Sequence, residues 1–395
     1  MSSFHRTCSG SVWNASRRSG TRRLATGSGN GSSGASRPRS SGRQSSRQVD
    51  SRLALNPSIL ATSSPMARKV TLREPHGLQV ELVNVGAAIK SIRVPAGNRA
   101  VDVVLGYRQL QDYLADPYYL GVTLGRYAGR IANGRFTLGD REIEIDFDPR
   151  QGPHALHGGP GGLHSRVWRI EPPRNSDRVE FRHVSPDGDQ GFPGRLDIRV
   201  TYSLVDRMRL AIDYVAVSDS ETVVNLANHA YFNLNGDGRT IDDHHVAIYA
   251  DAYTVQDEDV LPTREIRCVV GTPYDLRQGV VLEERFGALA GPPYALDGFD
   301  QNFALAGGGQ EPVRAASLYG PRSGIRMNLY STQPGMQFYT GQHLGPPFAP
   351  RAGLCLEAQR FPDAPNQPGF PSALLRPGEV YRQRTVYAFE WMGNP

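Results

Sequence analysis

The chain has 395 residues, of which 39% are hydrophobic, so most of it can bury a substantial core. Its net charge of +5 is unevenly distributed: residues 1–65 hold ten arginines and one acidic residue, leaving 34 basic and 38 acidic residues in 66–395. The part from residue 66 onward, at about −4, therefore lacks the positive charge of a nucleic-acid-binding domain. No apolar run approaches the length of a membrane span, so no membrane association is expected.

The cysteine content points to a reducing compartment. Cys8, Cys268 and Cys355 are far apart and odd in number, so they form neither a disulfide framework nor a metal knuckle. We therefore expect a cytoplasmic protein.

The first 65 residues differ in composition from the rest of the chain. Residues 1–49 contain no Asp or Glu and are dominated by Ser, Gly and Arg, which predicts a disordered tail. The stretch resembles an organellar transit peptide, but a dispensable tail, or a start of translation at Met66, is the favoured interpretation. A nucleic-acid-binding arm is a weaker alternative. One β domain over 66–395 is expected to fold and function without the tail.

From residue 69 onward the pattern is one of many short strands. Polar and apolar residues alternate at 78–82, 142–147, 195–202 and 209–217. Helical periodicity is limited to short stretches at 108–114 and 280–290. Closely spaced strands without intervening helices predict an all-β protein built as one large antiparallel β-sandwich with few short helices.

Five segments place polar groups inside otherwise structural sequence, and the first two are rich in glycine. Residues 125–136 contain three arginines among small residues, which leaves room for a side chain to reach a ligand; the segment lacks the Lys-Ser/Thr of a phosphate loop. His154 and His157 have metal-ligand spacing, but the many nearby glycines and prolines argue against a helix and no third ligand is obvious, so no metal site is expected. His157, before Gly158-Gly159, is instead expected to donate a hydrogen bond where backbone and ligand approach closely.

The other three segments contain titratable groups. Residues 225–234 carry His229 among three asparagines and aromatic residues, which suits a pocket for a neutral, hydroxyl-rich ligand; a core histidine held by its neighbours is the alternative. Asp300 lies between Phe299 and Phe303, as in carbohydrate sites where a carboxylate binds sugar hydroxyls beside an aromatic face. Glu357 follows an apolar run that predicts a buried strand, so its carboxylate needs a partner or a polar cleft, as a catalytic base does.

Taken together, these segments resemble the aldose 1-epimerase (galactose mutarotase) family over essentially all of 66–395. The resemblance rests on motifs that occur in family order: Gly125-Arg126, Arg130-Ile131-Ala132, Leu156-His157-Gly158-Gly159, 228–234, Phe299-Asp300, 334–341, Leu356-Glu357 and 361–366. It implies a galactose mutarotase-like supersandwich that interconverts the α and β anomers of free aldoses such as galactose or glucose. It also implies no cofactor and no metal, a small-molecule sugar as partner, and a monomer or weak homodimer.

The resemblance also implies roles for individual residues. Glu357 would act as the base and His229 as the acid, with His157 hydrogen-bonding near the ring oxygen. Arg130, Asp300 and Gln337 would bind the sugar. Two positions depart from the family pattern: Gly129 replaces a frequent asparagine and Gln301 a frequent histidine, which bears on sugar preference.

Three other functions remain open from the sequence. A hexose-phosphate 1-epimerase would need a cationic cluster, for which Arg126, Arg130 and Arg135 are candidates. A noncatalytic sugar-binding module could use the same sandwich, but would not need both an acid and a base. A glycoside hydrolase could use Asp300 and Glu357 as its carboxylates, but would leave the histidines without a role.

Overall fold

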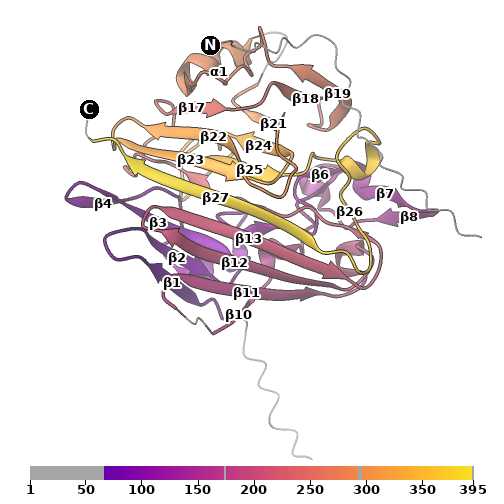
Figure 1. Ribbon diagram of the computed structural model, residues 1–395. Helices are drawn as coiled ribbons and strands as arrows, with labels where there is room; N and C mark the ends of the chain where they lie inside the picture. The colour runs from indigo at the N-terminus through magenta and orange to yellow at the C-terminus, as the bar shows by residue number, and fades with distance from the viewer. Residues whose placement is uncertain (1–65, 173–174, 292–295, 394–395) are drawn as a thin grey trace, which may run out of the picture. The chain divides into compact units, whose positions relative to one another are not determined.

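A computed structural model describes residues 66–172, 175–291 and 296–393. The predicted tail at 1–65 lies outside the described residues. Within them the regular secondary structure is mainly antiparallel strands with few short helices, so the predicted all-β sandwich is confirmed (Figure 1). No described helix is both long and apolar enough to cross a membrane.

The largest sheet has nine strands in the order β10-β11-β12-β13-β27-β23-β22-β17-β20. The C-terminal strand β27 lies between β13 and β23, as its yellow ribbon shows in Figure 1, so the two halves of the chain meet in one sheet. Strands of this sheet alternate between buried and exposed residues, as expected when one face packs on the core. Their bounds are β10 Arg169–Ile170, β11 Arg178–Ser185, β12 Leu196–Asp206, β13 Arg209–Ser218, β17 His245–Ile248, β20 Val280–Val281, β22 Val313–Gly320, β23 Ile325–Ser331 and β27 Tyr381–Trp391.

A six-stranded sheet, in the order β16-β25-β24-β21-β18-β19, carries three of the six predicted site residues: Asp300, Gln337 and Glu357. Its strand β25, between β16 and β24, is buried along its whole length, which agrees with the buried strand expected before Glu357. The bounds are β16 Tyr231–Phe232, β18 Ala252–Gln256, β19 Pro262–Cys268, β21 Asp300–Ala304, β24 Gly335–Tyr339 and β25 Leu354–Gln359.

The remaining strands form smaller units among the described residues. A four-stranded sheet has the order β1-β2-β3-β4, and four two-stranded pairs are β14-β26, β15-β5, β6-β9 and β7-β8. Their bounds are β1 Lys69–Arg73, β2 Gln79–Val83, β3 Ala88–Ala96, β4 Arg99–Asp102, β5 Thr123–Leu124, β6 Arg130–Ile131, β7 Arg135–Leu138, β8 Arg141–Glu144, β9 Ala155–Leu156, β14 Thr222–Val223, β15 Ala227–Asn228 and β26 Leu374–Leu375.

The two predicted helical stretches both form short helices. The stretch at 280–290 becomes α1 (Leu282–Ala290), and the stretch at 108–114 becomes the 3₁₀ helix η1 (Leu110–Ala115). The other 3₁₀ turns are η2 Ala132–Gly134, η3 Pro149–Gln151, η4 Leu163–Ser165, η5 Asp189–Gly191 and η6 Ala364–Asn366.

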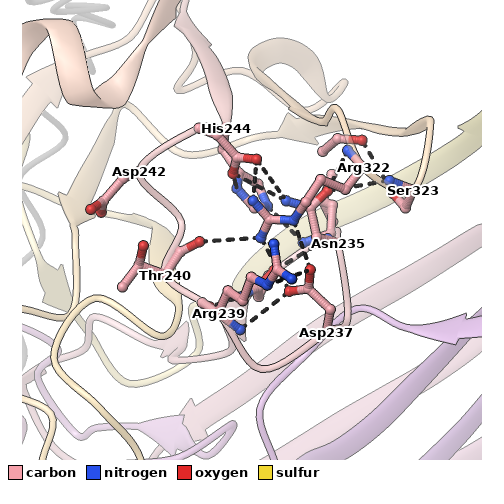
Figure 2. A network of polar contacts seen from close by, with 12 residues as sticks. Asn235, Asp237, Arg239, Thr240, Asp242, His244, Arg322 and Ser323 are labelled. Carbon is pink, nitrogen blue, oxygen red and sulfur yellow. Dashed lines mark hydrogen bonds and ion pairs between the residues drawn. The ribbon is translucent and has the colours of Figure 1, made fainter. Parts of the chain in front are cut away.

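A polar network fixes the loop that connects β16 to β17 (Figure 2). Arg322 binds Asp237 through Nε at 2.7 Å and also contacts Asp243. The side-chain oxygen of Asn235 accepts the backbone N–H groups of Arg322 at 2.9 Å and Ser323 at 3.3 Å. Because this loop follows directly after the 225–234 segment, the network holds that segment against the turn between β22 and β23.

Candidate active site

Strand pairing determines which side chains of the six-stranded sheet line the site. Asn302 on β21 pairs with Gln337 on β24, which pairs in turn with Glu357 on β25. Side chains two residues apart on a strand share a face, so the neighbouring row projects to the same side. That row is Asp300, Tyr339, Cys355 and Tyr231. The residues of these two rows other than Cys355 form one wall of a cavity of about 530 Å³.

The opposite wall comes from loops around β6 and β9. Arg130 on β6 pairs with Leu156 on β9, which places His157 beside the site. A Cβ at Gly158, where φ is +90°, would lie 2.1 Å from the carbonyl oxygen of Gly125, so only glycine fits there. The sequence predicted a close approach of backbone and ligand after His157. At Gly158 the close approach is instead between two backbone segments.

All six predicted site residues line this cavity: Glu357, His229, His157, Arg130, Asp300 and Gln337. The Nε2 atom of His229 lies 3.7 Å from Oε1 of Glu357, and both side chains are buried. The carboxylate of Asp300 accepts a 2.6 Å hydrogen bond from Nε2 of Gln337, and Arg130 lies 4.0 Å from its other oxygen. The site thus places an acid–base pair beside a separately held carboxylate.

Burial decides the protonation of the acid–base pair. It lowers the pKa of His229 to about 4, so this imidazole is neutral near pH 7. Burial also raises the pKa of Glu357 well above its usual value, with the charge of Asp300 adding to the effect and Arg130 opposing it. Both shifts favour the neutral forms, in which the pair holds one proton, on the carboxyl group of Glu357.

His157 differs from His229 in its hydrogen bonding. Its Nδ1 atom accepts the backbone N–H of Gly129 at 3.1 Å, so the proton of the neutral ring lies on Nε2. Burial lowers the pKa of His157 well below its usual value, and the nearby His229 and Arg130 add to this effect. His157 is therefore a neutral hydrogen-bond donor near pH 7.

Potential metal ligands of His157, His229 and Glu357 lie within 4.8 Å of one another, a set of residue types found in catalytic zinc sites. A histidine that binds a metal must offer an unprotonated nitrogen. The hydrogen bond from Gly129 occupies the free nitrogen of His157 and leaves the proton on Nε2. This tautomer opposes metal binding, and the absence of a metal stays a prediction.

Four buried oxygen atoms in the cavity wall lack a hydrogen-bond partner among the described residues. All four are acceptors: Oε2 of Glu357, Oε1 of Gln337, Oδ1 of Asn302 and Oε1 of Gln359. Buried acceptors without partners are costly, so they favour a ligand rich in hydroxyl donors. Asn302 and Gln359 were missed in the sequence, although each lies two residues from a predicted site residue on the same strand.

The arginine cluster considered for a phosphate-binding site is not formed. Arg126 is buried and donates to Ser185, Pro186 and Pro193, away from the cavity. Arg135 forms ion pairs with Glu142 and Glu144 on the hairpin of β7 and β8. Of the three arginines only Arg130 lines the cavity, so the cluster that this alternative required is not formed by these residues.

The two departures from the family pattern have different positions. Gln301 is not among the cavity-lining residues; its Nε2 donates to the backbone oxygen of Thr254 at 2.6 Å, so it supports the sheet. Gly129 lines the cavity with φ of +84°. The departure at Gly129 is the one that can change contacts with a ligand.

The fold and the site together define a β-sandwich enzyme of carbohydrate chemistry. The family model described as aldose 1-epimerase matches residues 68–388. The chain is 42% identical to galactose mutarotase from Bos taurus over 79% of its length and 91% of the relative, and 37% identical to aldose 1-epimerase from Escherichia coli over 84% and 97%. The chain belongs to the aldose 1-epimerase family.

Solved structures agree with this assignment. An aldose epimerase homologue from C. elegans superposes with a TM-score of 0.75 at 29% identity, covering 83% of this chain and all of the other. Galactose 1-epimerase from Lactobacillus acidophilus gives a TM-score of 0.71 at 27% identity, covering 83% of this chain and 99% of the other. The predicted family and supersandwich fold are therefore confirmed.

Proposed function

We propose that this protein interconverts the α and β anomers of a free aldose such as galactose or glucose. The observation that carries the proposal is the set of four unpartnered buried acceptors around the His229–Glu357 pair. A monosaccharide offers several hydroxyl donors to such a wall. The relatives named galactose mutarotase and aldose 1-epimerase support the same reaction.

Anomer exchange needs one proton removed and another added. A base takes the proton of the anomeric hydroxyl while an acid protonates the ring oxygen, and the C–O bond of the ring breaks to give the open-chain aldehyde. Rotation about the C1–C2 bond exposes the other face of the aldehyde. The ring then closes with the two roles reversed, so the protein ends in its starting protonation state.

Glu357 and His229 have the geometry for these two roles. In the productive form the single proton of the pair moves from Glu357 to His229, which gives a carboxylate base and an imidazolium acid. His157 donates from Nε2 to the oxygen on which charge develops. Asp300, held by Gln337 and Arg130, accepts hydrogen bonds from ring hydroxyls. The pair thus accepts one proton from the sugar and donates one to it.

The reaction is tested by polarimetry of freshly dissolved α-D-galactose with and without the protein. We expect faster relaxation to the same final rotation, because a catalyst changes the rate and leaves the equilibrium unchanged. If galactose, glucose and xylose all relax at the uncatalysed rate, the proposed reaction is wrong, and hexose 6-phosphates are the next substrates to assay.

The pH dependence of kcat/KM should reflect the buried pair. Below about pH 4 a second proton binds to the pair and blocks the base, because the pKa of His229 is lowered to about 4. Above the raised pKa of Glu357 the pair loses its only proton and lacks an acid. We expect kcat/KM to stay level down to about pH 5 and to fall below it. An acidic limb near 6.5, the ordinary value for histidine, would contradict this protonation scheme.

Replacing Gly129 by asparagine should strengthen sugar binding. Asparagine tolerates positive φ, and a Cβ at this position meets its nearest atom, Nε2 of Gln359, at 3.5 Å, an ordinary contact. One added hydrogen bond to a hydroxyl lowers KM by about two- to tenfold. Gly129→Ala is the control, since it adds the Cβ without the amide. Equal KM values for the two variants, measured by polarimetry, would exclude the added contact.

A further inference from the structure

Tyr119 is a cavity-lining residue that lies outside every motif identified in the sequence. Its ring contacts His157 and His164, each with ring centroids 4.8 Å apart in an edge-on arrangement. The ring of His229 lies 5.9 Å away. Tyr119 thus contacts both histidines of the site and a third imidazole behind them.

The backbone of Tyr119 is held in an unfavourable conformation. Its φ is +59°, a region that aromatic residues rarely adopt and that persists only where neighbouring contacts enforce it. The carboxylate of Asp116 accepts the N–H groups of Tyr118 and Leu120, on either side of Tyr119. The hydroxyl of Tyr231 donates to the backbone oxygen of Tyr118 at 3.0 Å.

Backbone hydrogen bonds connect the segment that follows Tyr119 to His229. The N–H of Gly121 donates to the carbonyl oxygen of His229 at 3.0 Å, and the N–H of His229 donates to Val122 at 3.0 Å. The strained position of Tyr119 is therefore fixed relative to His229 itself. Such an arrangement keeps the tyrosine ring against the two imidazoles.

The ring limits both the orientation and the hydration of these imidazoles. His157 and His229 lie nearly perpendicular, at 85° with centroids 5.5 Å apart, and the edge contact of Tyr119 restricts rotation of His157. A tyrosine ring on the cavity side also excludes water from the imidazoles. Its hydroxyl donates to Oε1 of Gln151 at 3.2 Å, near the cavity surface.

We infer that Tyr119 is a positioning residue of this enzyme. It holds the imidazole rings of His157 and His229 in their relative orientation and keeps water from them during the transfer of protons. This inference rests on the proposed anomer exchange. Tyr119 acts through the two histidines, and the hydroxyl group is not required for the effect.

The charged and titratable surroundings of His229 determine how the effect can be measured. Groups that face or approach it come from several elements: Glu357 and Cys355 on β25, Tyr339 on β24, Asp300 on β21, Tyr231 on β16, Arg130 on β6, and His157 and His164 on the loop after β9. Burial raises the pKa of Cys355 well above its usual value, so the thiol, with Sγ 3.4 Å from Nδ1 of His229, is neutral. None of these groups changes when Tyr119 is replaced. A shift in the titration of His229 is therefore caused by the loss of the tyrosine ring.

Tyr119→Gly removes the ring at a position where glycine adopts the observed φ without strain, so the variant is expected to fold. We expect the acidic limb of kcat/KM to move upward by about one pH unit or more as water reaches the imidazoles. We also expect kcat to fall about tenfold with a smaller change in KM, since the reacting groups lose their alignment. Tyr119→Phe keeps the ring and should leave the position of the acidic limb unchanged.

Two further measurements make the result specific. Tyr118→Ala removes a neighbouring aromatic ring of the cavity wall, which packs against Phe348. We expect the acidic limb of kcat/KM of this variant to lie at the same pH as in the wild type. NMR titration of the histidine ring protons follows the same shift without substrate. An unmoved titration in Tyr119→Gly, with only KM raised, would overturn the inference and make Tyr119 a sugar contact. Wild-type protein inactive on every sugar would instead overturn the proposed reaction, and the NMR titration would still test Tyr119.

Discussion

Replacing Glu357 by glutamine is expected to lower kcat by a factor of about 10² or more, the usual cost of removing a general base. Glutamine has the same shape and fits the buried site, but its amide cannot accept the proton of the anomeric hydroxyl. The neighbouring strands pair with β25 through backbone hydrogen bonds, so the sheet should be preserved. The rate is measured by polarimetry at saturating sugar.

The same variant separates an enzyme from a sugar-binding module. We expect Glu357→Gln to bind sugar still, because Asp300, Gln337 and Arg130 remain in place. Asp297→Asn is a matched control: this carboxylate is 84% exposed, pairs with Arg351 and does not line the cavity, so full activity is expected. Near wild-type turnover in Glu357→Gln would show that another group is the base.

Strand periodicity made much of the fold and of one cavity wall predictable. The alternating stretches at 195–202 and 209–217 correspond to β12 and β13, because alternation reports directly which residues face the core. The same rule relates Asp300 to Asn302 and Glu357 to Gln359, which the sequence already contained. The residues of this wall could therefore be identified from spacing once one member was known.

The opposite wall could not be predicted from local pattern. Tyr119 reaches the histidines only because Asp116 and Tyr231 fix a strained backbone, and Tyr231 lies 112 positions further along the sequence. Arg126 was equally misleading: its place among small residues suggested room to reach a ligand, whereas its guanidinium donates to backbone oxygens of residues about 60 positions away. Such roles depend on long-range packing rather than on neighbouring residues.

The protonation of His229 also required the structure. Nearby carboxylates favour an imidazolium, whereas burial favours a neutral ring, and a sequence does not give the depth of burial. In the structure the side chain of His229 is 5% exposed and burial dominates, so the neutral imidazole is favoured, and burial likewise favours the protonated carboxyl group of Glu357. His229 is therefore the acid only in the arrangement in which the shared proton lies on its imidazole ring and not on Glu357.

This shared proton makes the expected effect of His229→Asn as large as that of Glu357→Gln. Asparagine can donate a hydrogen bond but cannot give up a proton to the ring oxygen, so kcat should fall by a factor of about 10² or more. The loss should persist at all pH values, because no pH restores an acid at this position. Polarimetry across pH 4 to 9 measures it, with His183→Asn as a control that alters a histidine beside Trp168, away from the cavity.

The alternative of a purely structural His229 predicts a different outcome. A core histidine replaced by asparagine would lower the free energy of unfolding but leave kcat of the folded fraction nearly unchanged. Unfolding by urea, followed alongside the rate, therefore distinguishes the two cases. A stable His229→Asn protein with near wild-type kcat would remove His229 from the reaction, and His157, whose ring lies next to that of His229, would become the candidate acid.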